Sequence, residues 1–177
     1  IDYEVNLDDW SRWAIDNNIK TEVLGFLRFR PNLLHAFDAN QRAFPTPRSW
    51  QFVSELLEQG MPGEIQYEML KGTVGEGAAS ELEGFLRTYK NMPNPDAILL
   101  APDSVEVPED PATLYALSTA LGARASQQNV GNLMKYVDRM PVEFNIVTIR
   151  DAFRHNAAIA STRPFLDWSV KHSDVLI

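Results

Sequence analysis

Hydrophobic residues recur at helical spacing along this chain, and prolines and glycines divide the pattern into short segments. No stretch alternates apolar and polar residues as a strand would, and no repeat of fixed length is present. The pattern therefore predicts an all-α fold, a helical bundle with a further helical C-terminal extension. One of the clearest amphipathic segments carries its apolar residues at Ala78, Ala79, Leu82, Phe85, Leu86 and Tyr89.

The same signal, a capping residue followed directly by proline, predicts the start of two helices. Thr46 can cap a helix whose first turn accepts Pro47, and Asp110 and Pro111 repeat this arrangement. The first of these helices should end near Gly60. The residues expected on the inner face are Trp50, Val53, Ser54 and Leu57 in the first helix and Leu114, Leu117, Ser118 and Leu121 in the second.

Prolines concentrate in one part of the chain, at positions 93, 95, 102, 108 and 111. Such a density favours a boundary between two helical parts, with one or two helical turns at 95–100. The sequence thus predicts a helical domain at 1–92, a proline-rich linker at 93–111 and a helical extension of unknown role at 112–177.

The charge balance limits the partners that the chain can bind. Its 177 residues carry 16 Lys and Arg against 24 Asp and Glu, a net charge of −8, which works against binding to nucleic acid or to an anionic membrane. It has no cysteine and no apolar run of membrane-spanning length. We therefore expect a cytoplasmic protein without nucleic acid or membrane partners. Because it starts at Ile1 and not at Met, we also expect it to be part of a longer polypeptide.

Convergent catalytic or metal-binding groups are scarce. His35, His155 and His172 are far apart, and none belongs to a spacing that places two metal ligands on one helix face, so we predict no metal site. The acidic group Glu106, Glu109 and Asp110 lacks the spacing of a calcium loop and is expected to be a solvated loop. The four tryptophans, at positions 10, 13, 50 and 168, are expected in the core.

Glycines at 72, 75 and 77 form a cluster that suggests a phosphate-binding loop. No Gly-Lys-Ser/Thr follows it and no strand precedes it, so the cation that reaches the terminal phosphates is missing. We therefore interpret the cluster as a turn at which one helix stops and the next begins.

Arg48 is the most informative residue for function. It follows Thr46 and Pro47 in the first turn of a predicted helix, where a positive side chain opposes the helix dipole. The arrangement is explained if an anion such as a phosphate lies in front of the free backbone N–H groups, with Arg48 beside it. The alternative is a surface arginine that pairs with a nearby carboxylate, and sequence physics alone leaves both interpretations open.

Several segments of the first half resemble the C-terminal helical part of MoxR-like AAA+ ATPases, in particular bacterial and phage ATP-binding proteins of that group. The resemblance extends weakly to 72–75 and 110–117. The segments that carry it are Trp10-Ser11-Arg12-Trp13-Ala14, Ile19-Lys20-Thr21-Glu22-Val23, Phe26-Leu27-Arg28-Phe29-Arg30-Pro31 and Phe44-Pro45-Thr46-Pro47-Arg48-Ser49-Trp50-Gln51-Phe52-Val53-Ser54.

This resemblance implies a role for Arg48 as the sensor 2 arginine, which opens the lid helix and reaches the γ-phosphate of ATP. Thr46, Pro47 and Arg48 are the residues expected to bind the nucleotide. It implies ATP and Mg as cofactors of the full-length protein, and as partners an ATPase core domain, neighbouring subunits and a von Willebrand A-type protein. The chain itself has no Walker A, Walker B or sensor 1 motif. We therefore expect it to be inactive alone, as the lid region of a protein that hydrolyses ATP.

A helical protein–protein interaction module without a nucleotide role is the competing hypothesis. Under it, Thr46 and Pro47 only start a helix, and Arg48 forms a surface ion pair. A Gly-x-x-x-x-Gly-Lys-Ser/Thr motif upstream of the chain would favour the lid.

Overall fold

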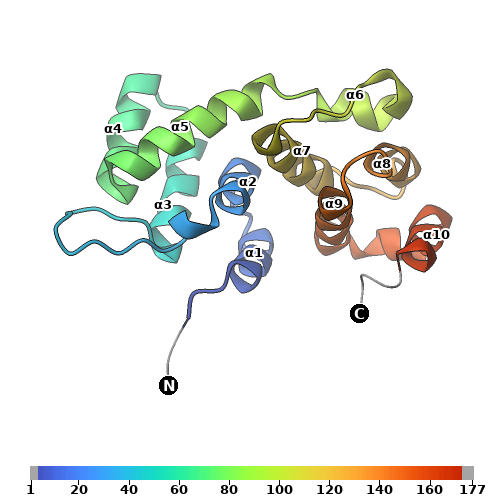
Figure 1. Ribbon diagram of the computed structural model, residues 1–177, viewed down its shortest axis with the longest axis horizontal. Helices are drawn as coiled ribbons and strands as arrows, with labels where there is room; N and C mark the ends of the chain where they lie inside the picture. The colour runs from blue at the N-terminus through green and yellow to red at the C-terminus, as the bar shows by residue number, and fades with distance from the viewer. Residues whose placement is uncertain (1–3, 173–177) are drawn as a thin grey trace. The chain divides into compact units, whose positions relative to one another are not determined.

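The computed structural model describes residues 4–172, and in that range every regular element is a helix (Figure 1). The all-α prediction is confirmed. The chain divides into two compact units, Ile1–Asn91 and Met92–Ile177. No helix among the described residues is both long enough and apolar enough to cross a membrane.

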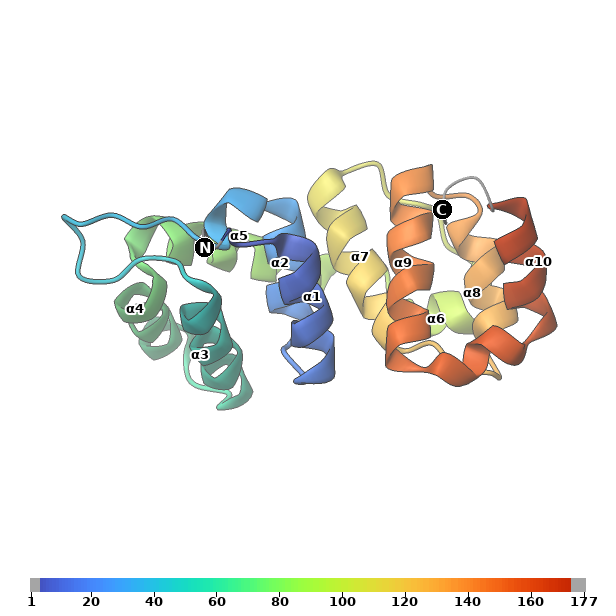
Figure 2. The ribbon, with the colours of Figure 1, turned by 90° about the horizontal axis from the view of Figure 1, so that it is seen from below.

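The first unit begins with two short helices and a 3₁₀ turn, continues through an irregular loop and ends with three longer helices. In Figure 2, α3 and α4 lie side by side, as their contacts require. The elements are α1 (Leu7–Asp16), α2 (Thr21–Phe29), η1 (Pro31–Leu33), α3 (Pro47–Glu58), α4 (Gly63–Val74) and α5 (Glu76–Asn91).

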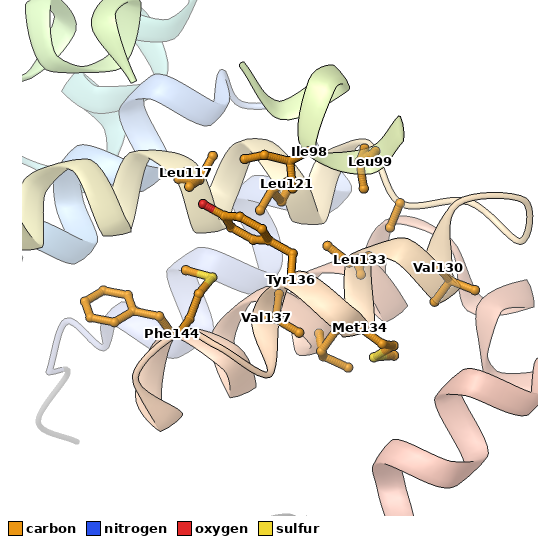
Figure 3. Close-up of a cluster of buried hydrophobic side chains, with 14 of the residues drawn as sticks. Ile98, Leu99, Leu117, Leu121, Val130, Leu133, Met134, Tyr136, Val137 and Phe144 are labelled. Atoms are coloured by element: carbon orange, nitrogen blue, oxygen red, sulfur yellow. The ribbon is translucent and has the colours of Figure 1, made fainter. Parts of the chain in front are cut away.

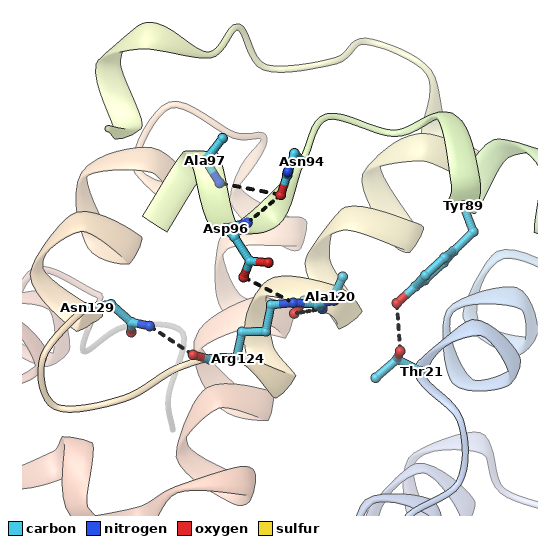
Figure 4. A network of polar contacts seen from close by, with 8 residues as sticks. All are labelled: Thr21, Tyr89, Asn94, Asp96, Ala97, Ala120, Arg124 and Asn129. Atoms are coloured by element: carbon cyan, nitrogen blue, oxygen red, sulfur yellow. Dashed lines mark hydrogen bonds and ion pairs between the residues drawn. The ribbon is translucent and has the colours of Figure 1, made fainter. Parts of the chain in front are cut away.

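Aromatic packing holds α2, α3 and α5 together. The Phe26 ring lies 5.4 Å from Trp50 and 5.7 Å from Phe85, measured between ring centroids, and all three side chains are buried. Such contacts stabilise a core beyond the area they bury. A hydrogen bond of 2.6 Å between the Thr21 and Tyr89 hydroxyls also joins α2 to α5 (Figure 4).

The second unit contains a short helix, a pair of longer helices in close contact, and two shorter helices beside them. The elements are α6 (Pro95–Leu100), η2 (Pro102–Ser104), α7 (Pro111–Ala123), α8 (Val130–Val137), α9 (Val142–His155), η3 (Ala157–Ser161) and α10 (Arg163–Lys171).

Helices α6, α7 and α8 supply the centre of this unit's core (Figure 3). Tyr136 is fully buried there, between Leu117 and Leu133, and its hydroxyl donates a hydrogen bond of 2.9 Å to the Glu106 carbonyl. Helix α9 crosses α7 closely at Gly122, where an added Cβ atom would lie 2.8 Å from the Asp151 Cβ. Only glycine permits this approach.

The proline-rich segment, expected to be a linker at 93–111, lies within the second unit. Its prolines at 95, 102 and 111 occupy the first positions of α6, η2 and α7, where a missing N–H costs no hydrogen bond. Ile98 and Leu99 of α6 are buried in the core. The Asn94 side chain caps α6, and Asp96 forms an ion pair of 3.4 Å with Arg124 at the end of α7 (Figure 4).

Candidate functional site

Helix α3 starts as the sequence predicts, with Thr46 as its cap and Pro47 in its first turn. The Ser49 N–H donates a hydrogen bond of 3.0 Å to the Thr46 hydroxyl, and the Thr46 N–H donates one of 2.8 Å to the Ser49 hydroxyl. This reciprocal pair is a capping box, which satisfies two donors that would otherwise be free. The box was not predicted, because serine at this position is a less usual partner than glutamate or glutamine.

The capping box changes the expected anion site. Pro47 has no N–H, and Ser49 uses its own N–H in the box, so only the Arg48 N–H remains free among the first three residues of α3. A row of free N–H groups in front of the helix is therefore not available. If an anion binds here, the Arg48 side chain must supply most of the attraction.

The Arg48 side chain is exposed, and within residues 4–172 it forms no hydrogen bond, ion pair or cation–π contact. A surface ion pair was the alternative explanation for this arginine, and no carboxylate in the described chain provides one. The guanidinium is thus available to a ligand outside this part of the chain.

The base from which Arg48 projects is firmly anchored. Trp50 is fully buried and donates a hydrogen bond of 2.7 Å from Nε1 to the Leu33 carbonyl. Ser54, also buried, accepts a bond of 2.9 Å from the Lys20 N–H. These bonds and the Phe26 contact fix α3 against α2, so the position of Arg48 is set by the packing of the first unit.

The loop before α3 is closed at its base and organised by one aspartate. The Ala36 N–H donates a hydrogen bond of 3.0 Å to the Pro45 carbonyl, which brings the two ends of the loop together. The Asp38 pKa is lowered, chiefly because its carboxylate accepts a hydrogen bond from the Asn40 N–H and another from the Gln41 side chain. The loop thus delivers the chain to Thr46 in a defined conformation.

Two other arginines that are close in sequence have different surroundings. Arg30 forms an ion pair of 2.7 Å with Glu81 and lies over the Phe29 ring. Arg28 is buried, with 7% of its surface exposed. Among the three arginines, only Arg48 combines an exposed side chain with the absence of any partner in the described residues.

The remaining sequence candidates have structural roles or carry no site. Only Gly75 forms the turn expected at 72–77: its φ is +83°, and an added Cβ would meet the Ala43 carbonyl at 2.8 Å. Gly72 and Gly77 are exposed and lie within α4 and α5, despite the weak helix propensity of glycine. Within residues 4–172, no group of three His, Asp or Glu side chains is placed to hold a metal ion.

The tryptophans follow the core expectation with one exception. Trp10, Trp50 and Trp168 are buried, whereas 39% of Trp13 is exposed. Phe52, on α3, is also 47% exposed and was not singled out from the sequence. Its position four residues after Arg48, outside the predicted inner face of the helix, was the available signal.

Comparisons of this chain with protein-family models, with curated proteins and with solved structures gave no match.

Proposed function

We propose that this chain is the lid region of an AAA+ ATPase, and that Arg48 binds the γ-phosphate of ATP held mostly by an α/β core domain. The observation that carries the proposal is the exposed Arg48 guanidinium, which has no partner within the described residues, on a helix whose opposite face is buried. An arginine in a first turn opposes the helix dipole, and no ion pair within residues 4–172 offsets that cost. A phosphate would compensate the charge directly.

The chemistry required of Arg48 is electrostatic. Phosphoryl transfer is accelerated mainly by positioning and by stabilising charge on the transferred group, and Mg supplies part of that stabilisation when it is bound with ATP. Arg48 would add a charge-assisted hydrogen bond, and the anchored helix α3 would convey the state of the nucleotide to the rest of the lid. Neighbouring subunits and a von Willebrand A-type protein are the partners that the family resemblance suggests.

Turnover kinetics test this proposal in the full-length protein. We expect Arg48→Ala to lower the ATP turnover rate at least roughly tenfold, because one charge-assisted hydrogen bond contributes about 1.5–3 kcal/mol. Arg42→Ala is the matched control, since Arg42 is also exposed and has no partner among the described residues but lies in the loop before α3. Unchanged kinetics in the Arg48 variant, with the fold intact, would contradict the proposal.

The interaction-module hypothesis is favoured by a different surface. Ile65 and Met69 stand one helical turn apart on α4 with 54% and 47% of their surfaces exposed, so that two apolar side chains are neighbours on its surface. Under this second hypothesis, the sequence preceding residue 1 lacks Gly-x-x-x-x-Gly-Lys-Ser/Thr. Finding that motif there would support the lid and weigh against a module without nucleotide.

A further inference from the structure

The surface of the α3–α4 hairpin gathers apolar side chains from both helices. A short loop, residues 59–62, joins these helices, which lie side by side (Figure 2). Phe52 on α3 has 47% of its surface exposed, and Ile65 and Met69 on α4 have 54% and 47%. Leu56 on α3 is partly buried. We call these four residues the hairpin patch.

Helix geometry places the hairpin patch in two adjacent rows. Phe52 and Leu56 are four residues apart on α3, as are Ile65 and Met69 on α4, and residues at this spacing are neighbours on a helix surface. Leu56 and Ile65 stand equally far from the connecting loop, and so do Phe52 and Met69. The short loop therefore brings the two rows to the same level. Paired rows of this kind form a surface into which a third helix packs.

The charges beside the hairpin patch are mostly negative. Within residues 47–74 the cations are Arg48 and Lys71, against four glutamates at positions 55, 58, 64 and 68. Lys71 pairs with Glu68 at 3.1 Å, and Arg48 lies at the end of α3 away from the connecting loop. The other three glutamates are exposed, and none of them forms an ion pair with a residue in the range 4–172. The loop end of the patch thus carries uncompensated negative charge.

Helix α10 provides a comparison, because it also exposes two apolar side chains one turn apart. Leu166 and Val170 have 49% and 77% of their surfaces exposed. The charged side chains of this helix are already neutralised at distances of 2.8 Å, in the ion pairs Arg163–Asp167 and Lys171–Asp138. The surface of α10 therefore has no preference for a partner of one charge, whereas the hairpin patch has one.

We infer that the hairpin patch binds a cationic amphipathic helix of a partner protein. The apolar residues of that helix lie on the patch, and its Lys or Arg residues lie beside the glutamates at positions 55, 58 and 64. Charge complementarity selects this partner, because an acidic helix would be repelled by the same glutamates. The inference goes beyond the proposed function, since it involves neither a nucleotide nor the Arg48 side chain.

Binding of synthetic peptides to the 177-residue chain tests the inference. The probe is a fluorescent helical peptide of about four turns, with Leu at positions i, i+3, i+4 and i+7 and Lys at the others. The control peptide has Glu in place of each Lys. In anisotropy titrations, we expect the Lys peptide to bind at least roughly tenfold more tightly than the Glu peptide, and to lose affinity as the ionic strength rises.

Matched variants test whether the Lys peptide binds at the hairpin patch. We expect Met69→Ala to weaken its binding at least roughly fivefold, because an apolar contact is lost, and Leu166→Ala, at a similar exposed fraction, to leave it unchanged. Glu55→Gln should weaken binding and reduce its salt dependence. Glu143→Gln is the control for charge, since Glu143 is also exposed and unpaired in the described chain but lies in the second unit. Matching thermal melts exclude unfolding as the cause.

Several results would overturn the inference. The patch would not select this partner if the Lys peptide failed to bind at concentrations up to about 1 mM, or if the Glu peptide bound equally well. Equal losses in Met69→Ala and Leu166→Ala would place the contact elsewhere. A dimer in sedimentation that Met69→Ala dissociates would assign the patch to a second copy. Unchanged ATP kinetics in Arg48→Ala would contradict the proposed function alone, because the peptide titrations do not depend on it.

Discussion

Helices α3 and α7 begin with the same signal and have different surroundings. In α3 the Ser49 N–H donates to Thr46 at 3.0 Å, and in α7 the Thr113 N–H donates to Asp110 at 2.8 Å, with a proline next to each cap. Helix α7 is buried along most of its length from Leu114 onward, whereas α3 buries one face and exposes the other.

This difference shows that the residues that start a helix are not the residues that give it a function. The second residue of α7 is Ala112, which is uncharged. The cap of this helix is Asp110, whose negative charge interacts favourably with the helix dipole. The second residue of α3 is Arg48, which opposes the dipole and pairs with nothing in the described chain. The Asp110 cap, Pro111 and Ala112 are all explained by the stability of α7, whereas the stability of α3 does not explain Arg48.

The largest effect is expected on the buried face of α3. Trp50→Ala should lower the free energy of unfolding by about 3–5 kcal/mol, because it removes a fully buried ring and leaves the Leu33 carbonyl without its donor. Urea denaturation measures the loss. Trp13→Ala, at a position 39% exposed, should cost clearly less, and equal losses at the two positions would show that α3 is not anchored as described.

The close approach of α7 and α9 should make Gly122 sensitive to a single methyl group. Gly122→Ala places a Cβ 2.8 Å from the Asp151 Cβ and 3.2 Å from the Thr148 carbonyl. We expect overpacking to cost about 1–3 kcal/mol, which cancels or exceeds the roughly 1 kcal/mol gained in helix propensity. Gly84→Ala in α5, where nothing lies within 4 Å of the new atom, should instead be neutral or stabilising. Denaturation curves in which both variants gain stability would contradict this account of α7.

The two caps should both stabilise the fold, and the acidic one somewhat more. Thr46→Ala and Asp110→Ala each remove a hydrogen bond to the third helical residue and should each cost about 1 kcal/mol, with a slightly larger loss at Asp110 because its carboxylate also interacts favourably with the helix dipole. Chemical denaturation of both variants provides the comparison. A negligible loss at Thr46 alone would mean that the capping box does not fix the start of α3.

Exchanging the second residues of the two helices should change stability least. Arg48→Ala removes a cation from the first turn and should stabilise the fold slightly, by about 0.3–1 kcal/mol, and Ala112→Arg should have the opposite sign. Thermal melts at low ionic strength reveal both shifts. A clear destabilisation by Arg48→Ala would show that this arginine has a structural partner.

Local signals in the sequence were sufficient for the starts of α3 and α7, because a cap and a proline act within one turn. The place of 93–111 could not be predicted, since proline density resembles a linker unless tertiary packing shows that Ile98 and Leu99 are buried. Trp13 was expected in the core and is 39% exposed, because periodicity does not reveal which helix covers a given face. The candidate site was also predicted only in part. The sequence places Arg48 in the first turn of α3, but the capping box and the exposure of Phe52 are seen only in the structure.

The affinities of the full-length protein for ATP and ADP test the central claim most directly. If Arg48 binds the γ-phosphate, the wild type prefers ATP by roughly ten- to a hundredfold through this contact, and Arg48→Ala loses that preference while keeping its affinity for ADP. Arg42→Ala, titrated by calorimetry in the same way, should retain the preference. An Arg48→Ala protein that still prefers ATP by the wild-type factor would show that Arg48 does not sense the terminal phosphate.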